Sequence, residues 1–305
     1  LIGIIRTVCR PTKTIKVGII GVGNIGSLLA FQLGQIPPVV QVKLFSKDNQ
    51  VVSGRALDMN QAVVDSREPK FIACNSPNEI FFNTDIVFIT LRDRAPAKTR
   101  PGLPERWQRI DSHLKIVHDY VKIACSKQFK GVIIMVTNPV DILTYACYYY
   151  SQTTKYPLRT YQIYGAGLEL DARRGRAYAR SIGEHLTAND ISIYGSHGED
   201  TKIINTAKRN LNTRLESLVR NASNEIRDKG VSRTTFGPVS SIIEVLVSII
   251  NGAPVHATVV QNGSYIGRKV NFRWGLPQFK DQSTDQQHKI VLKDNHDLIK
   301  KHLIS

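Results

Sequence analysis

The first half of the chain alternates short apolar runs with longer amphipathic stretches, and this alternation restricts the folds open to it. The apolar runs are rich in β-branched residues and cover residues 15–20, 42–45, 85–90 and 131–137. Strands buried on both faces of a sheet have this composition. The stretches with helical periodicity between them cover residues 24–36, 52–64 and 106–125. The alternation predicts an α/β fold, a doubly wound parallel sheet with helices on both faces.

The second half groups its helices and strands instead of alternating them. Helical periodicity covers residues 168–183, 205–229 and 236–251, and residues 191–194 predict a short strand. Residues 256–272 read as a β-hairpin that turns at Asn262-Gly263. This grouping predicts an α+β region that follows the parallel sheet.

Three glycines lie between the first predicted strand and the first predicted helix in G-x-G-x-x-G spacing. Gly21 allows a tight turn, Gly23 lets the backbone approach a pyrophosphate, and Gly26 lets helix and strand pack closely. The helix start, with Asn24 and Ile25, offers N–H groups and a positive dipole to the phosphates. The first half is therefore predicted to be a Rossmann-type sheet that binds a dinucleotide.

The end of the second predicted strand bears on the choice of dinucleotide. An acid is expected there to bond the adenosine ribose, but the chain has Ser46 followed by Lys47. These two side chains could accept the 2′-phosphate of NADP, which an acid would repel. NAD is the first expectation, with Asp48 or backbone groups at the ribose, and NADP is the alternative.

Composition narrows the classes of partner. The net charge of +16 is spread along the chain without a basic run that carries interleaved aromatics, which favours small anionic ligands over nucleic acid. No apolar run reaches the roughly 18 residues of a spanning helix, and the opening residues do not resemble a secretory signal. We therefore expect a cytoplasmic protein without membrane association. The four cysteines have no metal-ligand spacing, so we expect free thiols and no metal site.

Five ordered motifs resemble one family. They are "GVGNIG" (21–26), "VTNPVD" (136–141), "LDARR" (170–174), "GSHGED" (195–200) and "TTFG" (234–237). Together they resemble the L-lactate and malate dehydrogenases, including L-2-hydroxyisocaproate dehydrogenase-like members. The resemblance implies a dinucleotide-binding domain over residues 1–150, a substrate domain over 151–305, and a homodimer or homotetramer. It also implies hydride transfer between a nicotinamide cofactor and a small anionic L-2-hydroxy or 2-oxo acid.

The resemblance implies a catalytic set. His197 matches the proton-transfer histidine of the family, and a neutral imidazole can exchange a proton with an alcohol or carbonyl near pH 7. Asp171 matches the partner carboxylate, which fixes the ring tautomer and stabilises the imidazolium. Arg106 matches a mobile-loop arginine that polarises the reacting carbonyl.

A substrate-binding set is also implied. Arg174 comes three residues after the partner acid on a predicted helix, shares its face, and resembles the arginine that grips the substrate carboxylate. Asn138 resembles an asparagine that contacts substrate and cofactor, and Thr234 resembles a substrate-side threonine. Arg100 resembles the malate dehydrogenase arginine for a second carboxylate, with a solvated loop arginine as the alternative.

Three positions depart from the family pattern. Besides Ser46, the chain has Arg92 where the family has glycine and His113 where it usually has a cofactor-side asparagine. These departures leave open a catalytically impaired nucleotide-binding sensor or scaffold of the same fold. Arg173 and Arg176 are expected to be solvated neighbours of the substrate arginine.

Overall fold

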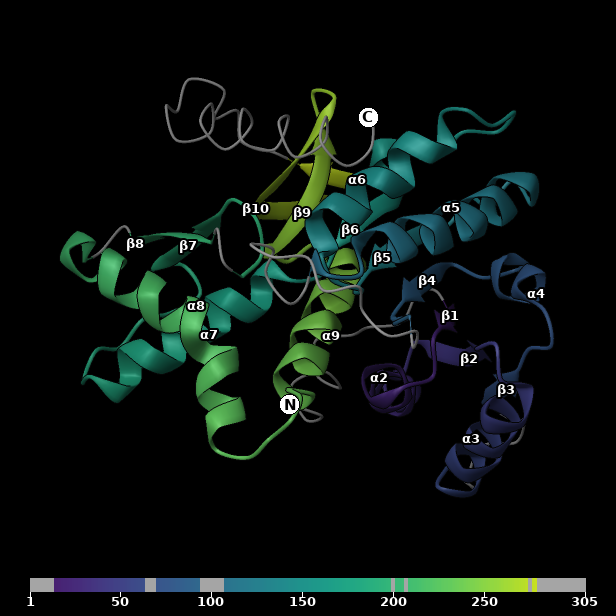
Figure 1. The fold of residues 1–305 in the computed structure, drawn as a ribbon, viewed down its shortest axis with the longest axis horizontal. Coiled ribbons are helices and arrows are strands. Elements are labelled where there is room, and N and C mark those ends of the chain that lie inside the picture. Colours follow the sequence, from purple (N-terminus) through teal and green to yellow (C-terminus); the bar gives the residue numbers. More distant parts are fainter. Residues whose placement is uncertain are drawn as a thin grey trace. The chain divides into compact units, whose positions relative to one another are not determined.

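A computed structural model of the chain describes residues 14–63, 70–93, 107–198, 201–205, 208–273 and 276–278 (Figure 1). The chain forms two compact units. The first comprises Leu1–Pro139 and Ala146–Tyr164, and the second comprises Val140–Tyr145 and Gly165–Ser305. The division into domains over residues 1–150 and 151–305 stays a prediction.

The first unit is built on a sheet whose described strands follow the order β6-β5-β4-β1-β2-β3. The strands are β1 (Ile15–Ile20), β2 (Val39–Phe45), β3 (Phe71–Ala73), β4 (Ile86–Ile89), β5 (Val132–Met135) and β6 (Ile163–Gly165), the last of which ends in the second unit. The pairs β1/β2, β1/β4, β2/β3 and β4/β5 are parallel. The order reverses between β1 and β4, as in a Rossmann fold, and the predicted doubly wound α/β sheet is confirmed.

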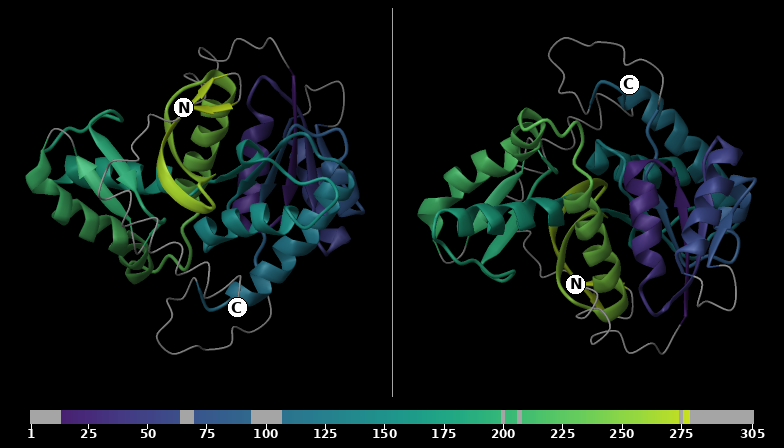
Figure 2. Two further views of the ribbon diagram at one scale, coloured as in Figure 1. Left: turned by 90° about the horizontal axis from the view of Figure 1, so that it is seen from above. Right: turned by 90° about the horizontal axis from the view of Figure 1, so that it is seen from below.

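Helices connect these strands. They are α2 (Asn24–Gly34), α3 (Asn49–Gln61), α4 (Pro77–Phe81), α5 (Ile110–Ser126) and α6 (Val140–Ser151), with a 3₁₀ turn η2 (Thr160–Gln162). α2, purple in Figure 2, packs against β1 and β2. α5 is amphipathic, and its buried face carries Ile110, His113, Leu114, Val117 and Val121 at helical spacing. The polar His113 therefore lies on a face that is otherwise apolar.

The second unit is α+β, as predicted. Its elements are α7 (Leu168–Ser181), β7 (Ile191–Tyr194), β8 (Lys202–Asn205), η3 (Arg209–Leu211), α8 (Asn212–Asp228), α9 (Phe236–Asn251), β9 (Val255–Gln261), β10 (Ser264–Arg273) and β11 (Leu276–Gln278). α7 and α8 lie side by side in this unit (Figure 2). Their apolar faces enclose a core with β7 and β8 that includes Leu168, Ile193, Leu215 and Val219.

Two expectations for the second unit had different outcomes. The hairpin is confirmed, because β9 and β10 are antiparallel and Asn262 and Gly263 both have positive φ, as a two-residue turn requires. The helix expected over residues 205–229 is wrong at its start. Residues 202–205 form β8, which pairs with β7, and α8 begins only at Asn212. A four-residue strand depends on a partner that local periodicity does not reveal.

Three general features accompany the fold. Among the described residues, no helix is long and apolar enough to cross a membrane. No group of three or more His, Cys, Asp or Glu side chains within the described ranges could hold a metal ion. Cys74, Cys125 and Cys147 are buried free thiols, and burial raises the pKa of Cys74 to about 11. Thiols this poorly ionised are weak nucleophiles.

Candidate active site

His197 lies in the turn that follows β7, and glycines shape this turn. Gly195 and Gly198 have φ of 88° and 91°, in the left-handed region that favours glycine. Gly195 also bridges to Gly267 of β10, where an added Cβ would lie 2.1 Å from the Gly195 carbonyl oxygen. The close approach of β10 therefore confines the backbone that carries the imidazole.

Asp171, in the first turn of α7, holds the ring of His197. Its Oδ2 lies 2.8 Å from Nδ1 of His197 and also accepts from the Gly198 N–H at 3.1 Å and the Thr201 hydroxyl at 2.8 Å. Burial raises the pKa of the Asp171 carboxyl, but His197, Arg174 and Thr201 together hold it below its ordinary value. An ionised Asp171 accepts a hydrogen bond from Nδ1–H of His197, so Nε2 is the unprotonated, basic nitrogen of the neutral ring.

A second buried carboxylate holds the backbone of the same histidine. Oδ2 of Asp141 accepts from the His197 N–H at 2.8 Å, and the Thr258 hydroxyl donates to its Oδ1. Burial raises the pKa of Asp141, against the opposing effect of these two donors. His197 is thus anchored twice, at its ring by Asp171 and at its main chain by Asp141.

Gly167 provides the space that the imidazole occupies. A Cβ at this position would lie 2.7 Å from Cγ of His197 and 2.8 Å from a methyl group of Val140. Asp141, Gly167, Thr201 and Thr258 were not predicted as site residues. Asp141 stands inside the "VTNPVD" motif, which could have suggested it. The others have no sequence signal, because only the folded second unit brings them to the histidine.

Arg174 shares the face of α7 with Asp171. One guanidinium nitrogen lies 3.7 Å from Oδ1 of Asp171, and another donates to Oγ of Ser223 at 3.1 Å. The Arg174 side chain is 13% exposed. The three-residue spacing therefore places the acid and the guanidinium together, as expected for an i, i+3 pair.

The expectation that Arg173 and Arg176 are solvated is wrong. Arg173 donates to Glu244 at 2.7 Å and also bonds Ser240, which ties α7 to α9. Arg176 donates at 3.1 Å to Glu169, whose other oxygen accepts from His256. The acid that pairs with Arg173 lies on α9, and the acid that pairs with Arg176 lies seven residues earlier on α7 itself.

The glycine-rich turn of the first unit fits a pyrophosphate. Gly21 has φ of 103°, and a Cβ on Gly26 would lie 1.9 Å from the Gly21 carbonyl oxygen. At Gly23 an added Cβ would meet no atom within 4 Å. α2 starts at Asn24 without a side-chain cap, and Ile25 is half-buried beside it. Its first N–H groups thus face an open approach over Gly23, which suits an anion.

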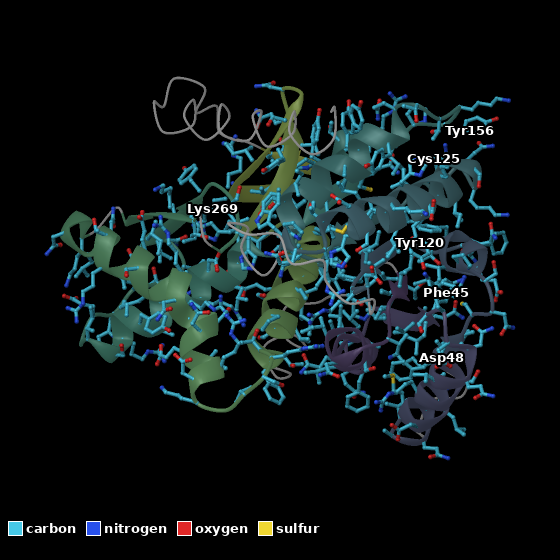
Figure 3. The ribbon with its side chains drawn as sticks, in the orientation of Figure 1. Phe45, Asp48, Tyr120, Cys125, Tyr156 and Lys269 are labelled. Carbon is cyan, nitrogen blue, oxygen red and sulfur yellow. The ribbon has the colours of Figure 1, made fainter. Side chains whose placement is uncertain are left out.

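The turn after β2 is arranged around the start of α3. Ser46 Oγ accepts from the Asp48 N–H at 3.3 Å, and Asp48 Oδ1 accepts from the Val51 N–H at 3.1 Å. Asp48, labelled in Figure 3, is the N-cap of α3, and Lys47 is exposed. One carboxylate oxygen of Asp48 therefore caps α3, and the other oxygen is the one left for a ribose hydroxyl.

Four further residues were predicted to contact the substrate, and the structure describes two of them. Asn138 is exposed after the end of β5 and precedes Pro139, the N-cap of α6. Asn138 is therefore not the N-cap of α6. Thr234 is half-buried just before α9. Arg100 and Arg106 lie outside the described residues.

Comparison with known proteins assigns the family. Residues 15–158 match the lactate/malate dehydrogenase NAD binding domain. These residues are a domain of the lactate/malate dehydrogenase family, and the chain is similar to such dehydrogenases over most of its length. L-lactate dehydrogenase 1 of Listeria innocua is 25% identical over 94% of this chain and 95% of its own. A malate dehydrogenase of Sulfurimonas denitrificans is 28% identical over 61% of this chain and 55% of its own.

Solved structures of lactate/malate dehydrogenases have the same fold. The malate dehydrogenase of Archaeoglobus fulgidus, solved in complex with NADH, has a TM-score of 0.78 at 19% identity, covering 95% of this chain and 98% of that one. A lactate dehydrogenase from a Medee basin deep-sea metagenome has a TM-score of 0.76 at 20% identity, covering 96% and 98%. The resemblance to lactate/malate dehydrogenases that the five ordered motifs predicted is confirmed.

Proposed function

We propose that this chain is an NAD(H)-dependent dehydrogenase of small L-2-hydroxy acids. The observation that carries the proposal is the contact between His197, Asp171 and Arg174 in a chain of the lactate/malate dehydrogenase family. Bound NAD supplies the chemistry of accepting or returning a hydride at the substrate C2. Lactate-, malate- and hydroxyisocaproate-type acids are the candidate substrates.

In the proposed reaction His197 moves the proton. During oxidation, Nε2 takes the proton of the substrate hydroxyl while C2 loses its hydride, and the alcohol becomes a ketone. During reduction, the imidazolium returns that proton to the carbonyl oxygen as C2 gains the hydride. Asp171 stabilises the imidazolium and keeps the other ring nitrogen protonated.

Arg174 is the proposed partner of the substrate carboxylate. Its guanidinium presents paired N–H donors that match the two carboxylate oxygens. Asn138 and Thr234 are proposed to orient the substrate, and Arg106 to polarise its carbonyl. Arg100 would select a second carboxylate, as in malate, since an unpaired cation in the site disfavours an apolar substituent.

Cofactor binding is assigned to the turn after β1. Gly21, Gly23 and Gly26 with the first residues of α2 would hold the pyrophosphate, because Gly23 leaves the approach open. NAD is the proposed cofactor. NADP is the alternative, supported by Ser46 and Lys47 where an acid would otherwise repel its 2′-phosphate.

A rate matrix tests this function. Purified protein is mixed with NADH or NADPH and with pyruvate, oxaloacetate or branched 2-oxo acids, and loss of the reduced-nicotinamide absorbance is followed. We expect turnover with at least one acid and a higher kcat/KM with NADH. Tight cofactor binding in calorimetry without any turnover would instead identify the sensor or scaffold.

A further inference from the structure

His113 connects the segments that follow two central strands of the first unit. Its Nε2 lies 3.3 Å from the backbone nitrogen of Asp93, which follows β4. Its Nδ1 lies 2.8 Å from the carbonyl oxygen of Asn138, which follows β5. The residue is only 4% exposed. A buried imidazole on α5 thus bridges two main-chain groups at the carboxyl ends of the strands.

The two partners determine the state of the ring. A backbone N–H can only donate and a carbonyl oxygen can only accept, so Nε2 must accept from Asp93 and Nδ1 must donate to Asn138. His113 is therefore neutral, with its proton on Nδ1. Protonation of Nε2 would set two donors against each other at 3.3 Å and break the bond to Asp93.

The charges around the ring agree with this state. Burial lowers the pKa of His113 below its ordinary 6.5, and Arg109 and Arg92 lower it further. The Asn138 carbonyl and Asp93 act in the opposite direction without reversing the shift. The bridge is consequently intact at neutral pH and is lost only as the pH falls below about 6.5.

Two threonines extend the bridge toward the glycine-rich turn. The Thr137 hydroxyl donates to the Leu91 carbonyl at 2.8 Å, and the Thr90 hydroxyl donates to the Gly21 carbonyl at 2.6 Å. The ends of β1, β4 and β5 are therefore joined by side chains as well as by the sheet. Asn138 stands at one end of this series of bonds and Gly21 at the other.

We propose that His113 is a positioning residue that fixes the main chain of Asn138, and that acid releases it. The proposal rests on the proposed function, because Asn138 is the residue assigned to contact substrate and cofactor. Asn138 is exposed, and the position of its side chain depends on the position of its backbone. The buried His113 fixes that backbone through the hydrogen bond to the Asn138 carbonyl oxygen. His113 touches neither reactant in this assignment and acts only through Asn138.

The first experiment measures the ring directly and needs no turnover. Nitrogen-15 NMR of the histidine rings distinguishes the two neutral tautomers and the charged form, and the signal that disappears in His113→Gln is assigned to this residue. We expect a neutral ring with the proton on Nδ1 at pH 7, with a protonation midpoint below 6.5. A charged ring at pH 7, or a proton on Nε2, would overturn the bridge.

The second experiment separates positioning from general structure. His113→Asn keeps a donor near the place of Nδ1, whereas His113→Gln carries its amide near the place of Nε2 and leaves no donor near that of Nδ1. We expect His113→Gln to lower kcat/KM by about tenfold through loss of the bond to Asn138, and His113→Asn to restore most of it. For 2-oxo acid reduction we expect kcat/KM of the unmodified protein to decline below pH 6.5, and both variants to lose this decline.

The control is His118→Gln on the same helix, where the side chain is 33% exposed. It should leave kcat/KM and its pH profile unchanged. Equal kcat/KM in His113→Gln and unmodified protein, or an acid decline that persists in both His113 variants, would overturn the positioning role. If the unmodified protein turns over no 2-oxo acid, the proposed function fails, while NMR and the pH dependence of NADH fluorescence titrations still decide on the bridge.

Discussion

Oδ2 of Asp171 accepts three hydrogen bonds, from the ring of His197, from the main chain of Gly198 and from the hydroxyl of Thr201. The carboxylate is completely buried, so these bonds are shielded from solvent. One oxygen atom thereby sets both the tautomer of the imidazole and the shape of the turn that carries it.

Asp171→Asn tests the effect of this carboxylate on the ring. An amide cannot stabilise the imidazolium, and its NH₂ group would favour the wrong tautomer. We expect kcat to fall by about 10²–10⁴-fold while NADH affinity, measured by fluorescence titration, stays unchanged. A parallel loss of NADH affinity would point to a disturbed fold and contradict the assignment.

Arg174→Lys tests the grip on the substrate carboxylate. A point charge cannot reproduce two parallel N–H bonds, so we expect KM for the 2-oxo acid to rise by about a hundredfold with a smaller change in kcat. Arg180→Lys is the matched control, because Arg180 is exposed in the last turn of the same helix. An unchanged KM in Arg174→Lys would remove this role from Arg174.

Two glycine substitutions separate cofactor binding from folding. Gly23→Ala places its Cβ in open space, so we expect a stable protein whose NADH affinity is weaker by about tenfold or more. Gly26→Ala drives its Cβ to 1.9 Å from the Gly21 carbonyl oxygen, so we expect a loss of about 2–4 kcal/mol in the free energy of unfolding. Urea unfolding and NADH titration of both variants check this contrast. An unstable Gly23→Ala variant, or a Gly26→Ala variant as stable as the unmodified protein, would contradict these roles of the two glycines.

Asp141 provides a test of the second anchor. Asp141→Ala leaves the His197 N–H and the Thr258 hydroxyl without their acceptor, and we expect a loss of about 2–4 kcal/mol in the free energy of unfolding. Asp141→Asn retains one acceptor oxygen for the His197 N–H and should lose less than half as much. Equal urea midpoints for the two variants would show that the acceptor does not matter.

The sequence predicted the parts of the molecule that local patterns specify. The parallel sheet followed from β-branched runs such as 15–20, and the hairpin followed from Asn262-Gly263, because period and turn chemistry are local properties. The partners of Arg173 were missed, since Glu244 and Ser240 lie on the distant α9. β8 was missed for the same reason.

In the candidate site, too, local patterns predicted some residues, and others depend on tertiary contacts. Asp171 and Arg174 could be placed together because helix geometry fixes an i, i+3 pair. The packing of Gly167 against His197 and the hydrogen bonds that Asp141 and Thr258 make depend on tertiary contacts without a sequence signature. In the sequence His113 stands out only as a departure from the family pattern, because its two main-chain partners come together only in the folded chain.

Transfer of deuterium tests the central claim most directly. The protein is incubated with NAD and an L-2-hydroxy acid that carries deuterium at C2, and the nicotinamide product is examined by mass spectrometry. We expect deuterium on the nicotinamide with the unmodified protein, and a rate lower by orders of magnitude with His197→Asn although cofactor affinity is retained. Absence of label with every acid tried, or equal labelling rates in both proteins, would contradict it.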